Sequence, residues 1–65
     1  MFHVMRSTRG EIRINLNLVT SARGTPNVDS GNVSVEITLA GGDNIEITIK
    51  DSEWKQFAQA LDSVK

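Results

Sequence analysis

The chain has 65 residues, a net charge of −1 and no cysteine, which suits one small domain without disulfide or thiolate–metal stabilisation. Its first residues, MFHVMRSTRG, are too polar for the apolar region of a signal peptide, and no apolar run reaches the length of a membrane span. We therefore expect a single cytoplasmic domain over 1–65, with no membrane segment, that is stabilised by packing alone.

Positive charge is concentrated in the N-terminal part of the chain. Residues 1–28 carry four arginines and one glutamate, whereas 29–65 carry three lysines and seven acids. Asymmetry of this kind can mark a basic binding edge, and it also arises by chance in so small a set of charges. The charge distribution therefore leaves nucleic acid open as a partner without establishing it.

Three segments alternate apolar and polar residues with the period of half-buried strands. They are EIRINLNLV (11–19), VSVEITL (33–39) and IEITIK (45–50), and FHVMR (2–6) is a shorter candidate. AGGDN (40–44) has the composition of a hairpin turn. TSARGTPNVDSGN (20–32) contains the only proline and many turn-forming residues, which predicts a long loop. The sequence thus predicts three strands and a shorter fourth at the N-terminus.

From Asp51 onward the apolar residues recur at steps of three and four, as on one side of a helix. Asp51 or Ser52 can cap the first turn, and Trp54 begins the apolar stripe as a core residue that holds the helix start against the sheet. The expected fold is α+β, in the order β-β-β-β-α. An antiparallel three- to four-stranded β-meander is followed by one C-terminal amphipathic helix packed on one sheet face.

The predicted sheet has more apolar surface than one helix can cover. Four strands span about 20 Å, whereas a helix with its side chains is about 10–12 Å wide. We therefore expect a second copy of the chain, related by a two-fold axis, to complete the cover in a homodimer. The alternative is that Phe2, Val4 and Met5 supply part of the cover instead. The inward-facing aliphatic residues of the three main strands are Ile12, Ile14, Leu16, Leu18, Val33, Val35, Ile37, Leu39, Ile45, Ile47 and Ile49.

Few side chains offer catalytic chemistry. His3 is the only histidine and lies beside apolar residues, so a structural role is expected, and no metal site is predicted. Glu36 and Glu46 fall on the solvated sheet face, where nothing prepares them for acid–base catalysis. We therefore expect a binding protein with no cofactor and no enzymatic activity.

The segment ITIKDSEWKQFAQAL (47–61) resembles the end of the PC4 (p15) family of transcriptional coactivators. In that family a strand with alternating apolar residues leads through a capping turn into a helix that carries an acid and a tryptophan. Glu53 and Trp54 are adjacent in this sequence rather than spaced. The resemblance covers roughly 44–64, and it implies a homodimer whose curved sheets bind single-stranded DNA or RNA without catalysis.

Under that resemblance the candidate nucleic-acid contacts are Arg6, Arg9, Arg13, Arg23 and Lys50. If the second strand runs to residue 19, roughly 30 Å separates Arg9 from Arg23 in one subunit, so only a dimer unites them on one surface. The outward residues of the three main predicted strands include no aromatic ring on which bases could stack, which counts against nucleic acid. Two alternatives stay open: a protein-binding module, such as a phage-type inhibitor or accessory protein, and a structural or assembly subunit.

Overall fold

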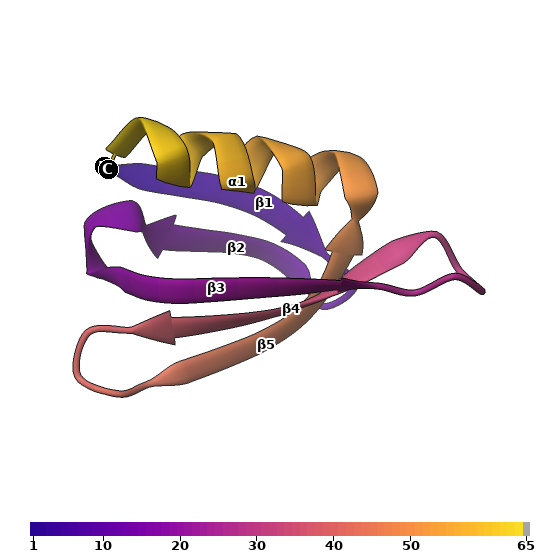
Figure 1. Ribbon diagram of the computed structural model, residues 1–65, viewed down its shortest axis with the longest axis horizontal. Helices are drawn as coiled ribbons and strands as arrows, with labels where there is room; N and C mark the ends of the chain where they lie inside the picture. The colour runs from indigo at the N-terminus through magenta and orange to yellow at the C-terminus, as the bar shows by residue number, and fades with distance from the viewer. Residues whose placement is uncertain (65) are drawn as a thin grey trace.

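The computed structural model describes residues 1–64, which form five strands followed by one helix. The elements are β1 (Phe2–Ser7), β2 (Gly10–Asn15), the 3-10 turn η1 (Leu16–Leu18), β3 (Val19–Pro26), β4 (Asn32–Leu39), β5 (Asn44–Lys50) and α1 (Asp51–Val64) (Figure 1). The predicted α+β class and the C-terminal helix are confirmed, and the sheet has five antiparallel strands where the sequence predicted three or four.

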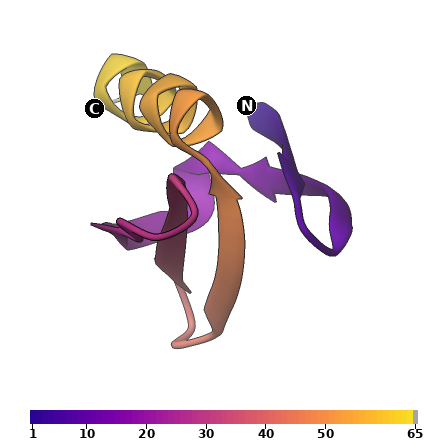
Figure 2. The same ribbon diagram turned by 90° about the vertical axis from the view of Figure 1, so that its right-hand side faces the viewer.

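The sheet consists of a hairpin and a meander that meet at a short seam. Its strand order is β2-β1-β5-β4-β3, so the hairpin β1–β2 adjoins the meander β3–β4–β5 through β1 and β5. That seam is narrow: Ser7 lies opposite Ile49, and the Thr8 N–H donates to the Thr48 carbonyl over 3.0 Å. The short turn η1 connects the two edge strands, β2 and β3, so the sheet must curl to bring them close. Figure 2 shows the result: the hairpin stands to one side of the meander, and α1 lies above both.

The second predicted strand ends earlier than expected, at Asn15 rather than residue 19. The Asn15 side chain accepts a hydrogen bond from the Asn17 N–H over 3.1 Å, which starts η1 in place of a continued ladder. Within this turn Leu16 is buried, but Leu18 is 47% exposed. The prediction that Leu18 faces the core is therefore wrong, since the turn interrupts the two-residue period.

The predicted loop over 20–32 is also wrong for most of its length. Val19–Pro26 forms β3, which pairs with β4 from Val19 opposite Leu39 to Pro26 opposite Val33. This strand is an edge strand, so it tolerates a proline and a glycine that a central strand would exclude. Only residues 27–31 remain as the connecting turn.

One chain closes the core without a partner. Phe57 and Leu61 of α1 are buried, together with Met5 of β1, which thus supplies part of the cover. Seven of the eleven predicted inward aliphatic side chains are buried, and Ile12, Leu39 and Ile45 pack partly buried around them. The seven are Ile14, Leu16, Val33, Val35, Ile37, Ile47 and Ile49. The curl of the sheet, rather than a second copy, supplies the missing cover, and the homodimer stays a prediction.

Helix α1 is fixed to the sheet at its first turn. Glu53 Oε1 accepts a hydrogen bond from the Arg6 backbone N–H over 3.2 Å. Trp54 packs against the core beside Phe57, with 6.0 Å between the two ring centroids. Trp54 is partly buried and lies at the margin of the core, and the predicted packing of the helix start against the sheet through this residue is confirmed.

Candidate binding surface

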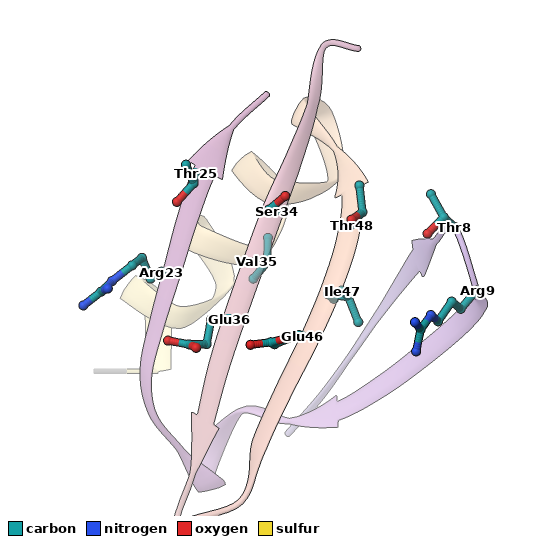
Figure 3. A pocket seen from close by; sticks show the side chains of 10 residues that line it. All are labelled: Thr8, Arg9, Arg23, Thr25, Ser34, Val35, Glu36, Glu46, Ile47 and Thr48. Carbon is teal, nitrogen blue, oxygen red and sulfur yellow. The ribbon is translucent and has the colours of Figure 1, made fainter. Parts of the chain in front are cut away.

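A hollow of about 560 Å³ lies on the sheet face opposite α1 (Figure 3). Strand register builds its floor from outward side chains: Arg23 lies opposite Glu36, and Glu36 lies opposite Glu46. A second row runs from Thr25 through Ser34 to Thr48. We call this the first hollow, and it is lined by Thr8, Arg9, Arg23, Thr25, Ser34, Val35, Glu36, Glu46, Ile47 and Thr48.

A second hollow, of about 490 Å³, lies at the end of the seam between β1 and β5, where α1 begins. Thr8 and Thr48 line both hollows, so the two adjoin at the seam. The lining of the second hollow is Arg6, Ser7, Thr8, Asn32, Thr48, Ile49, Lys50, Ser52, Glu53 and Gln56.

Four of the five predicted basic contacts line these two hollows. Arg9 and Arg23 line the first, and Arg6 and Lys50 line the second. We call these four residues, with the shared Thr8 and Thr48, the basic seam. Arg13 lines neither hollow; it lies on β2, where its Nε pairs with Glu11 Oε2 over 3.4 Å.

The expectation that Arg9 and Arg23 are united only in a dimer is wrong. It assumed a straight second strand, whereas η1 reverses the chain so that β3 returns along the far side of the meander. Both arginines therefore line one hollow in one subunit. In Figure 3, Arg9 extends from the β1–β2 turn toward β5, while Arg23 extends away from the opposite edge.

The charges of the basic seam are not neutralised by neighbouring side chains. Within residues 1–64 the ion pairs are Arg13 with Glu11 and Lys55 with Asp51, so the four seam cations have no carboxylate at ion-pair distance. Glu36 and Glu46 face each other on the floor of the first hollow, also without a cation in that range. Like charges directly opposite on neighbouring strands are destabilising. The surface thus combines free cations along its rim with two unpaired carboxylates on its floor.

The sequence did not predict that two of the hydroxyl residues, Thr8 and Thr25, belong to this surface. Thr8 lies between the predicted strands 2–6 and 11–19, and Thr25 lies in the predicted loop, so the sequence assigned neither residue to a sheet face. Ser34 and Thr48 were expected to point outward from the alternation of their strands, and they do. The pairing of β3 with β4, of β4 with β5 and of Thr8 with Thr48 brings the four together.

The described residues, 1–64, contain no cluster of three histidine, cysteine, aspartate or glutamate side chains that could hold a metal ion. In the same part of the chain, no helix has the length and apolar character required to cross a membrane. No protein-family model matches the sequence, and no curated protein or solved structure matches it at a significant level. The resemblance to the PC4 family stays a prediction.

Proposed function

We propose that the protein is a small non-enzymatic module that binds single-stranded nucleic acid along the basic seam. The observation that carries the proposal is the gathering of four unpaired cations, Arg6, Arg9, Arg23 and Lys50, around two hollows that adjoin at Thr8 and Thr48. Cationic and hydroxyl side chains are the usual donors to phosphate oxygens. The resemblance of 44–64 to the PC4 family supports the same class of ligand.

The contacts are expected to be with the phosphate backbone rather than with bases. No aromatic ring lines either hollow, and Trp54 is occupied in packing against the core. Without stacking, binding has little sequence preference and depends strongly on salt. With a net charge of −1 the molecule as a whole does not attract a polyanion, so we expect dissociation constants on the order of tens of micromolar.

The two floor carboxylates restrict the path of the strand. Glu36 and Glu46 repel phosphates from the middle of the meander. A strand that passes Arg9, crosses the seam at Thr8 and Thr48 and reaches Lys50 avoids them. Arg9 and Lys50 are therefore the side chains expected to contribute most.

Fluorescence anisotropy of a labelled strand of about 20 nucleotides, in about 50 mM salt, tests this proposal. Single strands should bind more tightly than the duplex, and Arg9→Ala with Lys50→Ala should weaken binding. Each lost phosphate contact should reduce the salt slope by roughly 0.7. The matched control is Lys55→Ala on α1, since Lys55 pairs with Asp51 and lines neither hollow. Absence of binding at tens of micromolar protein contradicts the proposal.

A second candidate is a basic segment of another protein. It is favoured by the Glu36–Glu46 pair, whose facing carboxylates have no cation of their own and suit an incoming lysine or arginine. The double variant Glu36→Gln with Glu46→Gln separates the two candidates, because it removes the same charges that repel a phosphate and attract a basic side chain. Affinity for a single strand should rise, whereas affinity for an oligolysine peptide should fall.

A further inference from the structure

The sheet has two edge strands, which differ in the regularity of the backbone that each presents to another chain. Edge strand β3 contains Pro26 and a register irregularity between Val19 and Ser21, which are features that block strand addition. Edge strand β2 has neither: its six residues pair with β1 in unbroken register, from Gly10 opposite Ser7 to Asn15 opposite Phe2. The open edge of β2 is thus available for a further strand.

The backbone of β2 directs alternate residues toward this open edge. The Arg6 N–H is bonded to Glu53 rather than to Glu11, its partner across the hairpin. The Arg6–Glu11 pair is therefore a non-hydrogen-bonded pair, and the Val4–Arg13 pair, two residues on, is one as well. In such pairs the N–H and C=O groups point away from the partner strand. The free groups of β2 consequently belong to Glu11, Arg13 and, at the end of the strand, Asn15.

We propose that two copies of the chain pair through β2, antiparallel, about a two-fold axis at Ile12. This register sets Glu11 opposite the partner's Arg13 and Arg13 opposite the partner's Glu11, and both pairs use the free backbone groups. Opposite charges directly across a strand pair are stabilising. It also brings Ile12, which is only partly buried in one chain, against the partner's Ile12.

Neighbouring registers are disfavoured by charge and by the pleat. An axis at Glu11 sets that residue against its own copy, and an axis at Arg13 does the same for the arginine, so each places like charges together. A slip by one residue sets inward side chains opposite outward ones, which the pleat does not allow. An axis at Ile14 sets Arg13 opposite the partner's Asn15, which is uncharged, so among axes at residues 11 to 14 only the one at Ile12 places opposite charges across the strand pair.

Charge exchange at positions 11 and 13 tests the proposal, which does not depend on nucleic-acid binding. By sedimentation at concentrations up to several hundred micromolar, the wild type should change from monomer to dimer, whereas Glu11→Arg and Arg13→Glu should each stay monomeric. An equimolar mixture of the two single variants should dimerise, because every facing pair is then of opposite charge. The double variant Glu11→Arg/Arg13→Glu should dimerise by itself for the same reason.

Circular dichroism should show both single variants folded, and dimerisation of their mixture is in itself evidence that they fold. Three outcomes overturn the proposal: a wild type that stays monomeric over the whole range, single variants that dimerise like the wild type, or a mixture that stays monomeric. The second outcome would assign self-association to a different surface.

Discussion

The indole of Trp54 lies directly on the backbone of Gly24, in the edge strand β3. A Cβ built at Gly24 would stand 2.6 Å from Cε2 and 2.7 Å from Cζ2 of the indole, closer than real Cβ atoms come to other heavy atoms. Gly24 lies opposite Val35, on the inner side of β3. The absent side chain of a strand glycine is thus the space that the first apolar residue of α1 occupies.

Gly24→Ala should destabilise the protein by about 1–3 kcal/mol, the usual cost of overpacking. The added methyl group meets the six-membered ring of the indole rather than the end of a flexible side chain. Urea unfolding gives the change in free energy. In a Trp54→Phe background the larger, fused indole is replaced by a single phenyl ring, and the same substitution should cost less. Equal costs in both backgrounds would show that the indole is not the cause.

Trp54→Ala should cost about 3 kcal/mol, the lower end of the range for large aromatic truncations, because the indole is partly buried. The change removes the contacts with Gly24 and Phe57 that hold the start of α1 against the sheet. This loss is comparable with the whole stability of a small domain, so circular dichroism should report a largely unfolded chain. A well-folded variant that had lost only a binding activity would instead make Trp54 a contact residue.

His3→Leu should raise the free energy of unfolding by roughly 1 kcal/mol. Nε2 of His3 is sealed from solvent and has no hydrogen-bond partner among the described residues, and the ring lies beside Phe57 with 5.6 Å between centroids. A polar atom buried without a partner loses its hydration, and an apolar side chain avoids that loss. His3→Gln, which retains polar atoms, is the control and should give no gain. Destabilisation by leucine would indicate that the imidazole makes a favourable contact.

Glu46→Gln should raise the free energy of unfolding by a few tenths of a kcal/mol at low salt, because it relieves the repulsion with Glu36. The gain should shrink as salt is added, since screening weakens the repulsion. Glu11→Gln is the matched control: it removes a carboxylate that has a partner, Arg13, and should give no gain. Thermal unfolding at two salt concentrations measures both. A gain of equal size at high salt would rule out charge repulsion as its origin.

Local pattern was enough to predict the elements whose two faces differ in polarity. The alternation in 33–39 and 45–50 gave β4 and β5 within one residue, and the change of period at Asp51 gave the start of α1. These elements have one side against the core and one in water, so apolar and polar residues alternate along the sequence with the period of the strand or helix. The α+β class followed from them.

Edge strand β3 could not be recognised in this way. The residues on its inner side are Ala22, Gly24 and Pro26, which lack the large aliphatic side chains that reveal a strand period. At Gly24 the indole of Trp54, from α1, fills the space instead. Asn15 ended the preceding strand through a side-chain hydrogen bond that competes with the ladder, which alternation does not report.

The location of the basic residues was decided by tertiary structure alone. The sequence determined which side chains are cationic and, for Lys50, that it ends a strand. It did not determine that Arg9, from a hairpin turn, and Arg23, from an edge strand, line one hollow. Their meeting depends on the turn at η1 and on the contact between Thr8 and Thr48, which are far apart in the chain. Periodicity records only which side of an element is buried, whereas long-range pairing decides which elements become neighbours.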